Sequence, residues 1–458
     1  MTTITMRIDE KGSDRPQELR ATVALAVPVA VVQLGFMAMG VVDTLMVGRV
    51  SARVLAAVAL GNLYFFNVSI FASGSIMALD PIVSQAVGAN DRPAVARAMQ
   101  RGLIISLGLG VLTSALLAVS PSVLYWLRQP AEIVPDAVAY LRISIIGVAP
   151  YLAFGVLRQT LQAMHLVRPV VWTILVANLT NAAFNWVFVY GHLGSPALGV
   201  AGSAIATAIS RWIMLLLLLA VAWRHVRPAL VPWLDSSMAP GPLWQMLRIG
   251  IPIGAQQALE AGAFGAVGLL MGVLGTVQMA AHQIAITLAA FTFMVPLGVG
   301  QAAAVRVGHA IGAGDDVRAK AAIRAAYICG VGFMSIAALA FLGAPRLLAH
   351  AFTPDERVVS LAAVLIPIAG VFQVFDGGQA VGAGVLRGAG DTTAPLVVML
   401  AAYWIVGVPV SAYLGFRTSL GPAGLWWGFV VSLAAVAIFL YLRIRILFRG
   451  SVRRLREE

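Results

Sequence analysis

Twelve predominantly apolar stretches follow one another along the chain, and they constrain its fold more than any other feature. A helix needs about 20 such residues to cross the hydrocarbon core of a bilayer. Only 11% of the 458 residues are charged and 60% are hydrophobic, whereas a soluble domain carries about 25% charged residues. The sequence therefore predicts an all-α polytopic membrane protein, with spans near 21–47, 55–79, 99–125, 138–160, 169–191, 198–223, 247–274, 279–303, 322–344, 360–385, 395–416 and 422–446.

The arginines and lysines are distributed unevenly between the two ends of these spans. When the N-terminus is placed in the cytoplasm, most of them fall in the two tails and in the cytoplasmic loops. Such a bias marks the cytoplasmic side of a membrane protein. We therefore expect a multi-pass protein of the cell (inner) membrane with both termini in the cytoplasm. The net charge of +12 then reflects membrane orientation and predicts no nucleic-acid partner. The first twenty residues lack the apolar core of a signal peptide.

An internal repeat divides the chain into two halves. The segment VSQAVGANDRPAVARAM at 83–99 resembles VGHAIGAGDDVRAKAAI at 307–323, and the same offset aligns Pro28 with Pro252. Each half holds six spans, so both halves enter the membrane with the same orientation and form a parallel repeat. The predicted organisation is a tail (1–20), an N-lobe (21–223), a cytoplasmic linker (224–246), a C-lobe (247–446) and a basic tail (447–458).

Two acidic residues lie near the middle of spans in the second half. Glu260 belongs to the seventh span, and Asp376 belongs to the tenth, in the segment VFQVFDGGQAVGAGVLRGAGD. A charge at the bilayer centre costs about 2.5–3.5 kcal/mol on insertion scales, so such residues usually face a partner or a cavity. The two carboxylates are expected to converge on a pocket that binds a proton or a small cation such as Na⁺. The alternative is that each carboxylate only bonds to a backbone or amide neighbour.

The first half offers a different polar set. Asp43 lies near the outer end of the first span, and Asn178, Asn181 and Asn185 follow an i, i+3, i+7 spacing in the fifth. This spacing places the three amides on one helical face. Amides in membrane helices commonly join neighbouring helices, but these could also complete a polar N-lobe site with Asp43 and Gln33. The remaining charges near or within spans, Asp80, Arg211 and His282, are expected to have local structural roles.

No signature of an enzyme is present in the sequence. It contains no GxxxxGK[ST] loop, no HExxH motif and no cluster of cysteines and histidines, and Cys329 is its one cysteine. We therefore predict neither an enzyme nor a protein with a resident cofactor. The partners expected instead are small molecules and membrane lipids, and nothing in the sequence calls for more than a monomer.

Several of these segments together resemble a known family. They are VDTLMVG in the first span, the VGANDR and IGAGDD loops, Glu260 after IPIGAQQAL, and FDGGQAVGAGVLRGAGDT in the tenth span. The chain is similar in these motifs to the multidrug and toxic compound extrusion (MATE) family, especially its bacterial NorM-type branch. The resemblance implies twelve helices in two six-helix bundles. It also implies secondary active efflux of cationic and amphiphilic compounds, in exchange for Na⁺ or H⁺, by alternating access.

The resemblance also implies roles for individual residues. Glu260 and Asp376 match the acidic residues that form the cation site of NorM-type members, where Na⁺ binds if the protein is sodium-coupled. Asp43 matches the family's span 1 aspartate, to which some branches assign proton coupling. Some sodium-coupled members carry a tyrosine four residues before the span 10 aspartate, and Phe372 stands there. The choice between Na⁺ and H⁺ therefore stays open. The further candidates for the substrate cavity or the polar N-lobe site are Gln33, Asn178, Asn181, Gln257 and Phe372.

One alternative of another kind is a lipid-linked oligosaccharide or lipid flippase with a related two-lobe fold. Such a protein is expected to line its cavity with basic residues that bind a pyrophosphate. Apart from Arg211, the spans here offer few. A major-facilitator transporter also has six plus six spans, but VGANDRPAVAR matches its basic G-x-x-x-D-R loop poorly.

Overall fold

The computed structural model describes residues 15–455 and is all-helical within them. It contains twelve helical segments that are long and apolar enough to cross a membrane, which confirms the predicted fold class. Two short helices, α5 (Ser120–Trp126) and α13 (Pro345–His350), lie between spans. The spans are α1 (Arg15–Gly48), α2 with α3 (Ala52–Ile76 and Leu79–Gly88), α4 (Arg92–Ala118), α6 with α7 (Val134–Ser144 and Val148–Ala163), α8 (Arg168–Tyr190), α9 (Val200–Leu230), α10 (Pro240–Leu274), α11 (Thr276–Gly312), α12 (Asp316–Gly343), α14 (Glu356–Gly388), α15 with η3 and α16 (Thr393–Met399, Leu400–Gly407 and Val408–Arg417) and α17 (Pro422–Leu447).

Several helices differ in extent from the predicted spans. The third span lies at Arg92–Ala118 instead of 99–125, because Asp91 caps its first turn: the Ala94 N–H donates to Asp91 Oδ1 at 3.1 Å. Helices α9 and α10 both extend into the segment 224–246 that the sequence assigned to a linker. Helix α1 begins at Arg15, inside the segment assigned to the N-terminal tail. The rest of that tail (1–14) and the last three residues (456–458) lie outside the described residues.

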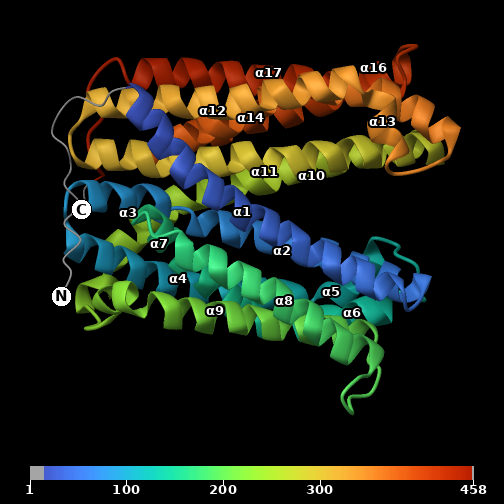
Figure 1. Ribbon diagram of the computed structural model, residues 1–458, viewed down its shortest axis with the longest axis horizontal. Coiled ribbons are helices and arrows are strands. Elements are labelled where there is room, and N and C mark those ends of the chain that lie inside the picture. Colours follow the sequence, from blue (N-terminus) through green and yellow to red (C-terminus); the bar gives the residue numbers. More distant parts are fainter. Residues whose placement is uncertain (1–14, 456–458) are drawn as a thin grey trace.

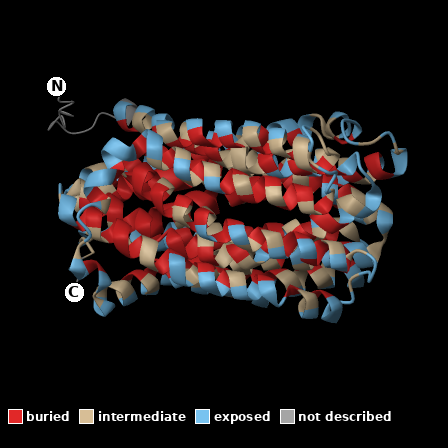
Figure 2. Ribbon diagram, turned by 90° about the horizontal axis from the view of Figure 1, so that it is seen from below, coloured by how far each residue is buried: buried red, intermediate tan, exposed pale blue. Residues whose placement is uncertain are grey.

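The helices form two bundles that lie side by side along the long axis of the molecule (Figure 1). Helices α1–α9 make up the N-lobe and α10–α17 make up the C-lobe. The described ends of the chain, Arg15 and Leu455, lie at the same end of the molecule, which we call the closed end. Figure 2 shows that buried residues are concentrated in the half of the molecule nearest this end.

Four turns at the closed end share one backbone conformation. Each contains one left-handed residue, at Asn90, His165, Gly314 and Gly390, with φ between 56° and 81°. In each turn the next N–H bonds to the carbonyl five residues back, as in the bond from the Asp91 N–H to the Ala86 carbonyl at 2.9 Å. This is the Schellman way of ending a helix. The sequence repeat shows only the turns at Asn90 and Gly314, in VGAND and IGAGD. The structure adds a second turn of the same kind in each lobe, at His165 and at Gly390.

Glycines bring the two lobes into backbone contact near the closed end. A Cβ on Gly88 of α3 would overlap the His309 carbonyl group of α11, and a Cβ on Gly312 of α11 would overlap the Gln85 carbonyl group of α3. The offset of the sequence repeat relates these two contacts to each other. Small residues allow membrane helices to approach closely, so the repeated GA motif also forms the symmetric centre of the lobe interface.

Candidate functional site

The two acidic residues of the C-lobe lie in one site, in which Asp376 is buried and Glu260 is half-buried. Helix α10 contributes Glu260 and α14 contributes Asp376, each from the middle third of its helix. Their carboxylates are close enough to repel each other. Asp376 is 4% exposed, and its Oδ1 has no hydrogen-bond partner among the described residues. The two side chains that the sequence singled out are therefore neighbours, and one carboxylate oxygen is free to accept a bond.

Two further side chains, Gln379 and Tyr403, join this site without having been predicted. Gln379 Nε2 donates to Glu260 Oε1 at 3.1 Å, and the Tyr403 hydroxyl donates to Gln379 Oε1 at 3.5 Å. Gln379 follows Asp376 by three residues, so its position on the same helical face was visible in the sequence. Tyr403 belongs to the π-helical segment Leu400–Gly407 of the eleventh span. Such segments are rare and frequently occur at functional sites, but nothing in the sequence indicates this one.

Aromatic rings form a wall beside the acidic pair. Phe372 lies one helical turn before Asp376 and is 1% exposed. Its ring packs edge-on against Phe264 at 5.9 Å and against Trp426 at 5.6 Å between ring centroids. Gln257, by contrast, points to the lobe interface, where its amide nitrogen lies 2.9 Å from Met77 Sδ. Phe372 therefore lies with the C-lobe site, and Gln257 does not.

Asp43 is the centre of a second polar site, in the N-lobe. Asn185 Nδ2 donates to its Oδ1 at 2.6 Å, and the Thr207 hydroxyl donates to its Oδ2 at 3.0 Å. Asp43 is 2% exposed, while Asn181 and Asn185 are fully buried. Asn181 lies beside the same carboxylate. One helical turn after Thr207, the Arg211 guanidinium packs 3.9 Å from the centroid of the Phe65 ring. Thr207 was not predicted, because one threonine in an apolar span carries no distinguishing signal.

Gln33 and Asn178 do not contact this carboxylate. Gln33 Oε1 accepts a hydrogen bond from Arg158 Nη1 at 3.1 Å, which links α1 to α7. Asn178 Nδ2 donates to the carbonyl of Gly35 at 3.0 Å, which links α8 to α1. The amide stripe of the fifth span is therefore divided: its outer members surround Asp43, and Asn178 joins helices.

The prediction that Asp80 has a local role is wrong, because its ion-pair partner lies in the opposite lobe. Its Oδ2 lies 3.2 Å from Arg387 Nε, and Arg387 belongs to α14 of the opposite lobe. Asp80 is fully buried, and Arg158 of its own lobe also interacts with it electrostatically. The pair joins the lobes close to the closed end.

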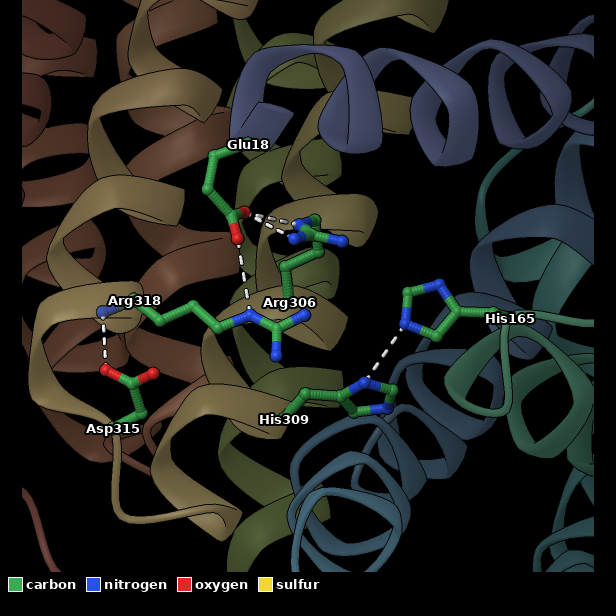
Figure 3. Close-up of polar contacts among 6 residues, drawn as sticks. All are labelled: Glu18, His165, Arg306, His309, Asp315 and Arg318. Atoms are coloured by element: carbon green, nitrogen blue, oxygen red, sulfur yellow. Dashed lines mark hydrogen bonds and ion pairs between the residues drawn. The ribbon is translucent and has the colours of Figure 1, made fainter. Parts of the chain in front are cut away.

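A second set of contacts crosses between the lobes at the closed end itself (Figure 3). Glu18 of α1 pairs with Arg306 of α11 and with Arg318 of α12, the latter at 3.2 Å. His309 Nε2 lies 2.7 Å from the Ala163 carbonyl oxygen, so it must be the donor there. His309 Nδ1 lies 3.0 Å from His165 Nε2, and in a neutral His309 ring it accepts the bond from that nitrogen. Burial lowers the pKa of His165 to about 4, so this ring is neutral at neutral pH.

The donor set of the C-lobe site suits a hard cation. Carboxylate, amide and hydroxyl oxygens are the ligands that such ions prefer. Glu260, Asp376 and Tyr403 supply oxygens of these kinds. Within residues 15–455, no group of three or more His, Cys, Asp or Glu side chains could hold a metal ion.

A protein with two helical lobes in one chain, lobe contacts at one end and a buried carboxylate site in each lobe is a membrane transporter of the alternating-access kind. The chain belongs to the MatE family, whose model matches residues 28–187 and 252–413. It is accordingly a transporter and not an enzyme.

Among the relatives, the chain is similar to the probable multidrug resistance protein NorM of Rhizobium meliloti, with 36% identity and 95% of each chain covered. It is also similar to the multidrug resistance protein NorM of Burkholderia vietnamiensis, with 37% identity and 93% of each chain covered. Among solved structures, the eukaryotic MATE transporter AtDTX14 has a TM-score of 0.86 at 23% identity, over 94% of this chain and 96% of that one. An outward-facing MATE family transporter has a TM-score of 0.84 at 21% identity, over 95% and 99%. These structures support the fold.

Proposed function

We propose that the protein is a secondary active multidrug efflux antiporter of the cell (inner) membrane. It exports cationic and amphiphilic compounds by alternating access in exchange for Na⁺ or H⁺, and it acts as a monomer, since one chain carries both lobes. Family membership and the relatives named multidrug resistance proteins support this proposal. The observation that carries it is the pair of carboxylates inside one lobe, with Asp376 buried and Glu260 half-buried.

The coupling follows from the charge of that site. With both carboxylates ionised, the site attracts a cation and is costly to leave empty in a low-dielectric environment. A drug cation, a proton or Na⁺ can each neutralise the carboxylates and remove the cost of leaving them unpaired. The three therefore compete for the same two carboxylates. An ion can drive the conformational change only if it binds the two states with different affinity. Closure of the lobes around the pair supplies such a difference, because closure changes the access of water to the carboxylates.

The neighbours of the acidic pair take separate roles in this mechanism. Gln379 holds Glu260 by its amide, and Tyr403 in turn holds Gln379, so both act as positioning residues. Asp376 keeps an oxygen free for the incoming cation. The rings of Phe372 and Trp426 offer apolar surface to an amphiphilic drug, and aromatic faces also attract organic cations. Tyr403 provides a hydroxyl near the site although Phe372 lacks one.

The closed end is proposed to face the cytoplasm. The support is the excess of arginine and lysine in the tails and loops at that end. The conformation described here is then closed to the cytoplasm, and the contacts of Asp80 and Glu18 across the lobes hold it closed. In the opposite state these contacts must separate.

Efflux of ethidium from proteoliposomes tests the proposal. The wild-type protein is compared with Glu260→Gln and Asp376→Asn, under a Na⁺ gradient and separately under a pH gradient, with Asp43→Asn as the matched substitution in the other lobe. We expect one gradient to drive efflux and both C-lobe substitutions to abolish it. If both variants keep coupled efflux, the pair is structural and the coupling site lies at Asp43. If the wild-type protein moves no drug under either gradient, the drug-efflux proposal is wrong and the flippase alternative gains.

A further inference from the structure

The segment after the last helix crosses from the C-lobe to the N-lobe. Helix α17 ends at Leu447, and residues 448–455 continue along the closed end of the molecule. The Leu455 N–H donates to Gln85 Oε1 of α3 at 2.8 Å. Arg454 Nη2 lies 2.8 Å from Asp91 Oδ2, in the turn that follows α3. A segment attached to one lobe thus bonds to the other.

Residues of both lobes form the site that holds Leu455, which we call its seat. Its backbone bonds to Gln85 of the N-lobe, while its side chain packs against the C-lobe turn at Gly390, where an added Cβ would lie 3.0 Å from Leu455 Cδ1. The left-handed φ of +81° at Gly390 and this close approach both favour glycine at the position. Val452 and Leu455 also pack against the hydrophobic core. Separation of the lobes would divide this seat.

Gln85 connects the segment to the lobe interface. Its Oε1 accepts from the Leu455 N–H, and its Nε2 donates at 2.9 Å to the Gly388 carbonyl of the C-lobe. The side chain is 1% exposed. An unbonded buried amide is unfavourable, so the polar atoms of Gln85 are satisfied together only when the closed end is closed and the segment is in place.

We propose that residues 451–455 form a strap that latches the two lobes at the closed end, and that the strap is released each time this end opens. Because the seat exists only when the lobes are together, strap binding favours the closed conformation by the same free energy with which closure favours strap binding. The Arg454 guanidinium holds the pKa of Asp91 below its ordinary value, so this pair is charged at neutral pH. Alternating access is part of the proposed function, but the latch itself does not depend on which compound is transported.

The strap contains its own control residue. Arg453 precedes Arg454 and makes no ion pair with any other residue in 15–455, whereas Arg454 makes the contact across the lobes. Asp91 also has a matched partner in the repeat, since Asp315 caps the equivalent helix through the Arg318 N–H at 2.8 Å. Asparagine is an equally good cap, so Asp→Asn at either position keeps the turn and removes only the charge.

The test measures the separation of the lobes directly. Spin labels are attached at Arg168→Cys in the N-lobe and Val317→Cys in the C-lobe, in a Cys329→Ser background, and distances are recorded by pulsed EPR in lipid nanodiscs. Both labelled positions are exposed. Arg454→Glu is compared with Arg453→Glu, and Asp91→Asn is compared with Asp315→Asn.

We expect Arg454→Glu and Asp91→Asn to move the distribution toward longer distances. The ratio of closed to open molecules should fall roughly two- to fivefold, as expected for the loss of one partly exposed ion pair. Arg453→Glu and Asp315→Asn should leave the distribution unchanged. The strap proposal is overturned if neither member of the Arg454–Asp91 pair changes the distribution, or if the control substitutions change it equally. Since no drug or ion gradient enters this measurement, its failure would leave the proposed efflux function untouched.

Discussion

Replacing Asp80 with asparagine removes the negative partner of a cation that is buried between the lobes. Asp80 is fully buried in α3, and its Oδ2 lies 3.2 Å from Arg387 Nε in α14. The Arg387 side chain is only 10% exposed, so water cannot replace the lost carboxylate while the lobes are together. Arg158 also interacts with Asp80 electrostatically, and it would lose this interaction in the variant. The substitution therefore leaves positive charge without compensation in the closed conformation.

The size of the effect follows from the burial of the pair. Removal of one partner from a buried ion pair costs about 3–5 kcal/mol, because the other charge is left desolvated. The cost applies mainly to the closed conformation, since opening of that end exposes Arg387 to water. A change of about 1.4 kcal/mol is tenfold in an equilibrium. We therefore expect Asp80→Asn to reduce the ratio of closed to open molecules by about two to three and a half powers of ten.

The spin-label pair on the two lobes measures this ratio. The double variant Asp80→Asn with Arg387→Gln removes both charges and should restore much of the closed population, because a neutral buried pair costs far less than one unpaired charge. Arg443→Gln is the control, since Arg443 is 45% exposed and pairs with Asp391 at 2.7 Å within the C-lobe alone. It should leave the lobes unmoved. The reasoning is refuted if Asp80→Asn leaves the distances unchanged, or if the double variant opens as far as the single one.

Three further changes have definite expected outcomes. Tyr403→Phe removes a hydroxyl that positions the acidic pair, so the apparent affinity for the coupling ion should fall several-fold in efflux titrations, while Tyr413→Phe at an exposed position should change nothing. Burial and two nearby guanidinium groups lower the pKa of His165 to about 4 when the lobes are closed, against about 6.5 in water. Opening therefore takes up a proton, and the closed population should decline as the pH falls from about 6.5 toward 4, less so in His165→Asn by the same EPR distances. Gly312→Ala places a Cβ against a carbonyl group of α3 and should shift the lobes apart in that measurement, whereas Gly332→Ala, which meets nothing within 4 Å, should not.

The spans and the repeat could be predicted because their signals are large and local. A run of about 20 apolar residues has few alternatives to a membrane helix. Glu260 and Asp376 were conspicuous for a related reason, since a carboxylate in such a run must have a partner or a function. Thr207 and Tyr403 carry no comparable signal, because single hydroxyl side chains are common in membrane helices. The sequence therefore located the charged centres of the two sites and missed part of their surroundings.

The contacts between the lobes could not be predicted in the same way. Asp80 and Arg387 are far apart in the sequence and lie in different halves of the repeat. Their pairing depends on how two complete bundles dock, which no local pattern specifies. The same holds for Gln33, which was grouped with Asp43 on polarity but bonds to Arg158 instead. Polarity indicates that a buried side chain needs a partner, and the packing of helices determines which partner it has.

The lobe interface combines symmetric packing with ion pairs that do not follow the symmetry. The close contacts of Gly88 and Gly312 are related by the repeat, so duplication of one motif produced both. The ion pairs have no such counterparts: the position equivalent to Asp80 in the second half holds Ala304, and the position equivalent to Arg306 in the first half holds Ile82. A change in one ion pair therefore alters the energy of the closed conformation once, without a matching change elsewhere in the interface. The repeated glycines determine how closely the lobes approach. The ion pairs without a counterpart in the repeat determine the free-energy difference between the closed and open conformations. An alternating-access transporter must keep this difference small, because both conformations have to be populated.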